Sequence, residues 1–270
     1  MSGQTPDGMN EPDGAKKPMS AKRKAVIGVL IAVACAAGGT GVYMLNSQRQ
    51  TQRDLEDLRD QVVTEADPAE TAAGTEAESE PYVSPVDFEQ LQLTNPDVYA
   101  WITVPGTVID YPVVQARDDM DFYLHRAWDR SNSYSGSVFS EPGRSKELTD
   151  AVTILYGHNM ADGSMFGTLK RYRDENYRDE HREICLYTAD GAYTYEVFAA
   201  VVYDDRLITA AYDLDTQEGV QDFLDSLAAT RNLNSWVADD VTVTPEDRVL
   251  VLSTCTNSSS ERYLVCGVLR

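Results

Sequence analysis

Short apolar runs separated by turn residues dominate the chain from residue 81 onward. Each run has the length of one strand, and glycine, proline, asparagine or aspartate bounds most of them. The turn at Asp190-Gly191 is the clearest hairpin signal, because both positions tolerate a positive φ angle. Strands are predicted at residues 99–104, 108–115, 152–157, 183–188, 193–202, 247–253 and 262–268. So many short strands with few helices favour a mainly β fold, closed into a barrel rather than a doubly wound sheet.

Apolar positions at helical spacing predict three helices in the same region. They are residues 87–93, a helix capped by the Ser164 hydroxyl, and a longer helix within residues 213–230. The apolar positions of the three are Phe88 and Leu91, then Met165, Leu169 and Tyr172, then Val220, Phe223, Leu224 and Leu227. We interpret these stripes as packing faces rather than as ligand sites.

The N-terminal region contains an uncharged apolar segment, residues 25–45, about long enough to span a bilayer core. Basic residues precede it and acidic residues follow, so the positive-inside rule predicts a single-pass membrane anchor with a cytoplasmic N-terminus. A cleaved signal peptide is an alternative, because Ala32-Val33-Ala34 resembles a cleavage site. A lipoprotein signal is another, because Cys35 follows that triplet. The apolar run continues to Leu45, which favours the uncleaved anchor.

Four segments follow from these patterns. Residues 1–24 are polar and are predicted to be a disordered cytoplasmic tail. Residues 25–45 form the transmembrane helix. Residues 46–80 combine a juxtamembrane helix with an acidic linker that lacks large apolar side chains. Residues 81–270 form one extracellular folded domain.

The formal net charge of −21 limits the partners. A strongly acidic surface disfavours nucleic acid and anionic lipid, and it suits a solvated extracellular domain that also accepts cationic substrates. None of the acidic stretches has the spacing of an EF-hand loop. The sequence leaves open whether calcium modulates activity, but we assign no metal ligands and no cofactor.

Three of the four cysteines lie beyond the predicted anchor, so at least one thiol stays free in a monomer. Cys185 and Cys266 sit within apolar strands and are expected to be buried, and the pattern leaves a disulfide between them open. Cys255 differs, because it ends a strand and polar residues surround it.

Cys255, His158 and Arg262 are the candidate catalytic residues. His158 follows the strand at 152–157, and Arg262 opens the strand after Cys255. A cysteine, a histidine and an arginine at the ends of neighbouring strands supply a nucleophile, a proton carrier and a cation for an oxyanion. For Arg262, a salt bridge with Glu261 is the competing interpretation. His125 and His181 are expected to be surface or boundary residues.

These residues and their neighbours resemble the sortase family, class B in particular, over nearly all of residues 81–270. The helical segments around 165–177 and before the cysteine strand are the features closest to class B. The motifs are Asn95-Pro96-Asp97, Trp101-Ile102, Pro105-Gly106-Thr107, Ile109-Asp110-Tyr111-Pro112-Val113-Val114, Gly136-Ser137-Val138-Phe139, Leu155-Tyr156-Gly157-His158-Asn159-Met160, and Leu252-Ser253-Thr254-Cys255 with Arg262.

The resemblance implies an eight-stranded β-barrel with an N-terminal helix and a helical insertion before the cysteine strand. It implies a membrane-tethered cysteine transpeptidase of Gram-positive bacteria that cleaves the C-terminal sorting signal of a surface protein, usually at a Thr-Gly bond. The new carboxyl group is then joined to an amine of peptidoglycan. By the same resemblance, Cys255 is the nucleophile, His158 the proton carrier and Arg262 the cationic partner, while Ser253 and Thr254 line the substrate groove.

Three other functions remain open at this point. A pilin-polymerising sortase would use a lysine as the acceptor, and a membrane-anchored binding domain would have no turnover. A cysteine peptidase would release its product instead of transferring it, and added amine separates the two because only a transferase forms the adduct. The sequence does not identify the sorting motif, the acceptor or the oligomeric state.

Overall fold

The computed structural model describes residues 46, 49–64, 82–256, 258 and 260–270. The predicted anchor at 25–45, the tail before it and most of the acidic linker lie outside these residues. Among the residues that are described, no helix has the length and apolar character needed to cross a membrane.

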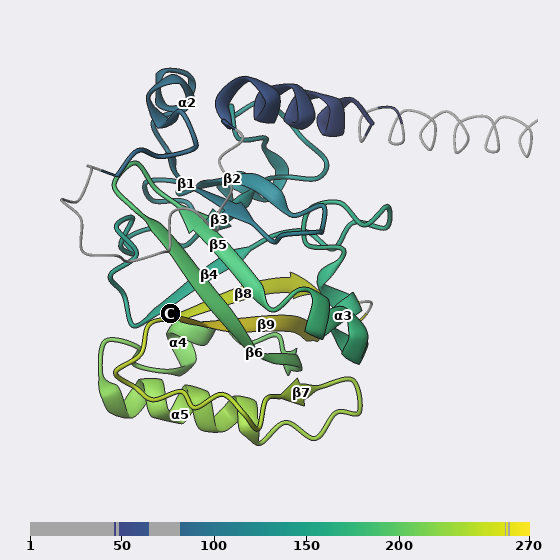
Figure 1. The fold of residues 1–270 in the computed structure, drawn as a ribbon, viewed down its shortest axis with the longest axis vertical. Helices are drawn as coiled ribbons and strands as arrows, with labels where there is room; N and C mark the ends of the chain where they lie inside the picture. The colour runs from purple at the N-terminus through teal and green to yellow at the C-terminus, as the bar shows by residue number, and fades with distance from the viewer. Residues whose placement is uncertain (1–45, 47–48, 65–81, 257, 259) are drawn as a thin grey trace, which may run out of the picture. The chain divides into compact units, whose positions relative to one another are not determined.

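Nine strands form one sheet, and eight of them close into a barrel (Figure 1). The strands are β1 (Val98–Thr103), β2 (Asp110–Val114), β3 (Val138–Ser140), β4 (Val152–Tyr156), β5 (Glu183–Tyr187), β6 (Ala192–Asp204), β7 (Trp236–Val237), β8 (Val249–Cys255) and β9 (Glu261–Leu269). Their order is β5-β1-β2-β3-β4-β8-β9-β6, and the pairing of β5 with β6 closes the ring. The two-residue strand β7 pairs with Ala199 and Ala200 of β6, after the part of β6 that pairs with β5. The prediction of an eight-stranded barrel is therefore confirmed.

Two strand pairings bring the candidate catalytic residues to one edge of the barrel. β4 and β8 run parallel, with Tyr156 opposite Ser253, so the chain leaves both strands at the same end. β8 and β9 run antiparallel, with Cys255 opposite Arg262. The segment after β4, the last residue of β8 and the start of β9 therefore lie next to one another.

The uninterrupted apolar run of β8 is explained by burial on both faces of the strand. Leu250 and Leu252 pack in one cluster with side chains from around the barrel. Val249 and Val251 point the other way, into a second cluster that contains the buried face of helix α5 (Gln217–Ala228). A strand covered on only one side would show alternating apolar and polar residues instead.

The predicted helices at 87–93 and 213–230 are confirmed. Helix α2 (Phe88–Thr94) begins after Asp87, whose carboxylate accepts from the Gln90 backbone N–H. Helix α5 begins after Thr216, whose hydroxyl accepts from the Gly219 N–H. With the short α4 (Ile208–Ala211), α5 forms the helical insertion that precedes the cysteine strand.

The helix predicted to begin at Ser164 is wrong in its position. Met165 adopts a positive φ of 52°, which a right-handed helix does not allow, and its backbone N–H donates to the Tyr111 hydroxyl. The Ser164 hydroxyl donates to Asp162 rather than capping a helix. The chain instead forms a 3₁₀ helix, η2 (Leu169–Arg173), followed by α3 (Glu175–Glu180). The three apolar residues assigned to the predicted helix are nevertheless buried, as expected.

Residues 49–62 form a helix, which confirms the juxtamembrane helix predicted within residues 46–80. Leu58 and Val62 are buried against a cluster that includes α2 and β1. The Arg59 guanidinium lies 2.8 Å from the Asp110 carboxylate on β2. This helix therefore belongs to the compact unit that spans Ser47–Arg270.

Candidate active site

Cys255 is the last residue of β8 and the first one of that strand to reach solvent. The six residues from Val249 to Thr254 are buried, whereas Cys255 is exposed. A buried strand thus holds the thiol at a fixed position while leaving it accessible. Ser253, two residues before Cys255, lies on the same face of the strand, because side chains alternate between faces.

The segment that carries His158 is fixed to β8 through Gly157. The Gly157 N–H donates to the Ser253 oxygen over 3.1 Å, and the Thr254 hydroxyl donates to the Gly157 oxygen over 2.7 Å. A Cβ atom at Gly157 would lie 2.7 Å from the Phe166 ring, closer than side chains pack, so glycine is required there. The cysteine strand and the histidine segment are therefore held together as one rigid unit.

The His158 imidazole has two neighbours in the 3₁₀ helix η1 (Phe122–His125). Its Nε2 atom donates to the Leu124 backbone oxygen over 2.7 Å, because a carbonyl oxygen can only accept. The His125 ring stacks against it, with 5.8 Å between centroids and 22° between planes. His125 is exposed, as predicted. Its contact with His158 was not predicted, because residues 125 and 158 come together only in the folded barrel.

Asn159 makes a second link between the histidine segment and the cysteine. Its side-chain Nδ2 donates to the Cys255 backbone oxygen over 2.9 Å. The His158 oxygen in turn accepts from the Phe166 N–H over 3.0 Å. Asn159 was not predicted as a site residue, although it directly follows His158 in the sequence.

Arg262 lies across from Cys255 in the β8–β9 pairing and is half-buried. Its Nη1 donates to the Glu261 backbone oxygen over 3.1 Å. Among the residues that the structure describes, no carboxylate pairs with the Arg262 guanidinium, so the competing salt bridge with Glu261 is absent. The cation remains available at the rim of the site.

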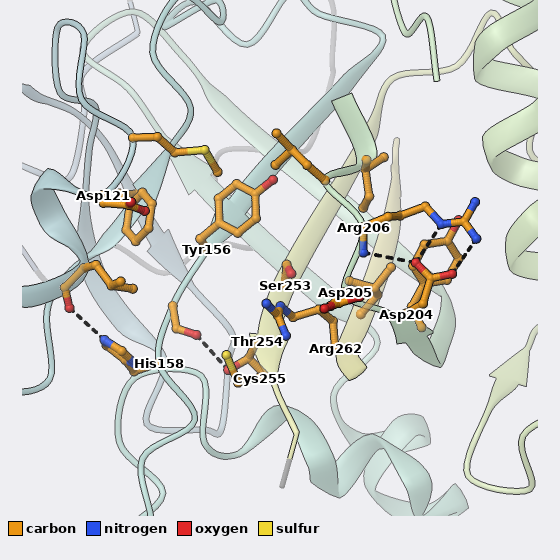
Figure 2. Close-up of a pocket in the computed structure, with 18 residues that line it drawn as sticks. Asp121, Tyr156, His158, Asp204, Asp205, Arg206, Ser253, Thr254, Cys255 and Arg262 are labelled. Carbon is orange, nitrogen blue, oxygen red and sulfur yellow. Dashed lines mark hydrogen bonds and ion pairs between the residues drawn. The ribbon is translucent and has the colours of Figure 1, made fainter. Parts of the chain in front are cut away.

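All five predicted site residues line one cleft of about 260 Å³, which we name the catalytic cleft. Figure 2 shows Cys255 between His158 on one side and Arg262 on the other. Ser253 is buried and also lines the cleft. Thr254 also contributes to the lining, but its hydroxyl is already engaged by Gly157. Leu124 of η1 and the segment from Asp204 to Ile208 line the cleft as well.

Two groups of polar contacts shape the walls of the catalytic cleft. The Arg206 Nε donates to the Asp204 carboxylate over 2.6 Å, which lowers the pKa of Asp204. Burial raises the pKa of Tyr156, so its hydroxyl stays protonated and donates to Glu141 over 2.5 Å. Thr209 of α4 donates to the second oxygen of Glu141 over 2.7 Å, which ties α4 to the barrel edge.

Cys185 and Cys266 are buried and free, so the disulfide left open by the sequence is absent. Burial raises the pKa of both thiols, which keeps them protonated and unreactive. Within the described part of the chain, no three His, Cys, Asp or Glu side chains gather as metal ligands. Cys255 is the exposed thiol among the described cysteines.

Comparison with known proteins identifies this arrangement. The family model for the sortase domain matches residues 102–270. Sortase B of Listeria monocytogenes is 35% identical over 170 residues, which are 63% of this chain and 67% of that protein. The structure of sortase B from Bacillus anthracis in complex with AAEK1 aligns with a TM-score of 0.67 and 27% identity, covering 84% of this chain and 100% of that one. The Staphylococcus aureus sortase B–substrate complex aligns with a TM-score of 0.59 and 30% identity, covering 68% and 84%. This chain therefore belongs to the sortase family, as a cysteine transpeptidase of class B.

Proposed function

We propose that this enzyme cleaves the C-terminal sorting signal of a surface protein at a Thr-Gly type bond and transfers the new carboxyl group to an amine of peptidoglycan. The observation that carries the proposal is the exposed Cys255 between His158 and Arg262 in a cleft on a rigid barrel edge. The S. aureus relative solved as a substrate complex supports a substrate-binding role for this fold. Neither pilin polymerisation nor a non-catalytic role is favoured by any residue of the site.

In the first half-reaction, the Cys255 thiolate attacks the carbonyl carbon of the scissile bond. A bond forms between Sγ and that carbon, and the carbon–nitrogen bond breaks. The leaving amine needs a proton, which His158 donates. The thioacyl enzyme that results holds the sorted protein until an acceptor amine arrives.

The Leu124 carbonyl assigns different tasks to the two His158 nitrogens. Nε2 keeps its proton, because it donates to that carbonyl. Nδ1 is therefore the nitrogen that carries the transferred proton.

Arg262 supplies positive charge where negative charge develops. The carbonyl oxygen of the substrate becomes an oxyanion when Cys255 attacks, and a preorganised cation lowers the energy of that state. Arg262 suits this task, because it lies opposite Cys255 and no described carboxylate neutralises it. Ser253, on the same face as Cys255, would contact the substrate backbone.

The proposal includes the topology predicted from the sequence. Residues 25–45 anchor the protein in the cell membrane, the N-terminus is cytoplasmic, and the catalytic domain of residues 81–270 is extracellular. The uncharged segment and the basic residues before it support this arrangement. Protease added to intact cells should degrade the catalytic domain and spare an N-terminal tag. A protected catalytic domain would contradict the topology.

The function is tested with the full chain in mild detergent and a panel of quenched sorting-signal peptides, with and without a small amine. Wild-type enzyme should cleave at least one peptide, and the amine should divert the product to an adduct. Cys255→Ala should show neither activity, whereas Cys185→Ala serves as the matched control and should retain both. Cleavage that persists in Cys255→Ala, or no cleavage of any peptide by the wild type, contradicts the proposal.

A further inference from the structure

A second cleft, of about 360 Å³, meets the catalytic cleft at the nucleophile. Its lining includes Asn159, Lys170, Arg173 and Tyr263, none of which lines the catalytic cleft. The two clefts share Thr254 and Cys255. Cys255 at the strand end therefore opens onto two separate spaces, and a thioacyl group formed in the first remains accessible from the second.

Helix η2 explains why two cations line this second cleft. In a 3₁₀ helix, side chains three residues apart project from the same side. Leu169 and Tyr172 are buried, so they fix one side of η2 against the core. Lys170 and Arg173 share the other side and are both exposed. Leu169 and Tyr172 therefore attach η2 to the core, while Lys170 and Arg173 present positive charge at the surface.

No carboxylate among the described residues pairs with Lys170 or Arg173. In the described part of the chain, eight contacts within 4.0 Å join arginines to carboxylates, and none of them involves these two side chains. Glu261 also lines the cleft, but its carboxylate contacts the Thr256 hydroxyl at 3.4 Å. The chain as a whole carries a net charge of −21, whereas the charged side chains that line this cleft are Lys170, Arg173 and Glu261, a net positive set.

Arg173 is also held in place. Its guanidinium carbon lies 5.1 Å from the centre of the Tyr263 ring, within the range of a cation–π contact. Tyr263 is buried and lies opposite Thr254 in the β8–β9 pairing, one residue from the catalytic pair. The cation is therefore fixed relative to Cys255, as a binding group needs to be.

We propose that the second cleft is the acceptor site, and that Lys170 and Arg173 bind an anionic group, a carboxylate or a phosphate, on the acceptor amine. This inference rests on the proposed function. The acceptor nitrogen attacks the thioacyl carbon, forming the carbon–nitrogen bond while the carbon–sulfur bond breaks. The electron pair of that bond goes to Cys255 Sγ, and the amine proton passes to His158.

The same two cations help the amine to react. A free amine is mostly protonated at neutral pH, and only its neutral form attacks a carbonyl. Neighbouring positive charge disfavours the ammonium form and lowers the pKa of the bound amine. Lys170 and Arg173 would therefore bind the anionic end of the acceptor and also increase the reactive fraction of its amine.

The test compares triglycine, whose C-terminus is a carboxylate, with triglycine amide, which lacks that charge, in full-length enzyme. Wild type should use triglycine with about a five- to tenfold higher kcat/KM for transfer, the size expected for two partly exposed charge contacts. An amine that ends in a phosphate, such as phosphoethanolamine, forms the third arm. A larger preference for it than for triglycine identifies phosphate as the favoured anion, and the reverse identifies carboxylate.

The double variant Lys170→Gln/Arg173→Gln should lose this preference while it cleaves the sorting peptide at the wild-type rate. Transfer by this variant should also need a higher pH. The matched control is Lys146→Gln/Arg117→Gln, which removes two cations that line neither cleft, and it should behave as wild type.

Two results overturn the inference while leaving the proposed function intact. In the first, wild type cleaves and transfers but uses triglycine and its amide equally well. In the second, the double variant loses cleavage and transfer to the same extent, which would mean that the two cations serve the structure. If wild type does not cleave any peptide, the proposed function itself fails, and the acceptor site fails with it.

Discussion

The His158 Nε2 atom donates to the Leu124 backbone oxygen over 2.7 Å, and the next residue, His125, stacks on the same imidazole. One turn of η1 therefore holds the imidazole of His158, the proposed proton carrier, by a hydrogen bond to a ring nitrogen and by stacking on the ring face. Two adjacent residues of a single 3₁₀ helix make both contacts, so any movement of η1 moves the imidazole with it.

Substitution of His125 tests whether the stacked ring positions His158. His125→Ala should lower kcat for peptide cleavage about three- to tenfold, because an aromatic pair contributes about 0.5–1.5 kcal/mol. His125→Phe keeps a ring at that position and should restore most of the rate with little change in KM. Steady-state cleavage kinetics measure both variants. Equal rates in His125→Ala and wild type would show that the stacking has no positioning role.

Arg262 is expected to act on the transition state rather than on substrate binding. Arg262→Gln should lower kcat about 100- to 1,000-fold, the size seen when one oxyanion donor is removed. Arg262→Lys should recover only part of the rate, because an ammonium lacks the planar fork of guanidinium. Arg270→Gln removes a cation that pairs with Glu196 away from the site, and it should leave kcat unchanged. An Arg262→Gln effect confined to KM would argue for a role in binding.

The hydroxyl of Thr254 is expected to hold the histidine segment against the cysteine strand. Thr254→Val preserves the side-chain shape but removes the hydrogen bond to Gly157, so the protein should lose about 1 kcal/mol of stability. The cleavage rate should fall as well, because the alignment of His158 with Cys255 depends on that contact. Urea unfolding and peptide cleavage would be measured for Thr254→Val beside Thr254→Ser, which keeps the hydroxyl. A loss as large in Thr254→Ser would assign the effect to packing.

The thiols outside the site should differ sharply in reactivity from Cys255. Burial raises the pKa of Cys185 and Cys266, so at any given pH less of each is thiolate than for an ordinary cysteine. Iodoacetamide at about pH 8 should therefore label Cys255 in the folded protein and spare both buried thiols. Peptide mapping by mass spectrometry, before and after unfolding in guanidinium, checks this. Rapid labelling of Cys266 in the native protein would contradict its burial.

The helix at residues 49–62 should contribute to the stability of the catalytic unit. Leu58 is 8% exposed and packs in a cluster with side chains of α2 and β1, so Leu58→Ala should cost about 2–4 kcal/mol. Leu93 of α2 is 83% exposed, and Leu93→Ala should change stability by less than about 0.5 kcal/mol. Thermal unfolding of the two variants provides the comparison. Equal stability would mean that the helix is only loosely attached.

Local pattern was sufficient for most of the strands and for helix α5. The apolar run at 247–253 and the stripe from Val220 to Leu227 both follow from burial of regularly spaced side chains, and both predictions were confirmed. The helix assigned to start at Ser164 was wrong, because Met165 adopts a left-handed backbone conformation that ends any helix there. Its backbone N–H donates to the Tyr111 hydroxyl, 54 residues away in sequence, and a local pattern does not reveal that contact. Strand β3 was not predicted, because its three residues are too few to show an alternation of apolar and polar side chains.

The sequence by itself predicted Cys255, His158 and Arg262 as the candidate catalytic residues, because each ends, follows or opens a strand with a clear apolar pattern. The surrounding motifs also indicated the family, which the comparisons confirmed. Only the tertiary structure decided what contacts them. The parallel β4–β8 pairing, the turn of η1 beside His158 and the two cations of η2 join residues far apart in the chain. Such contacts depend on how the barrel closes, and the free energy of closure comes from the whole core rather than from any local segment.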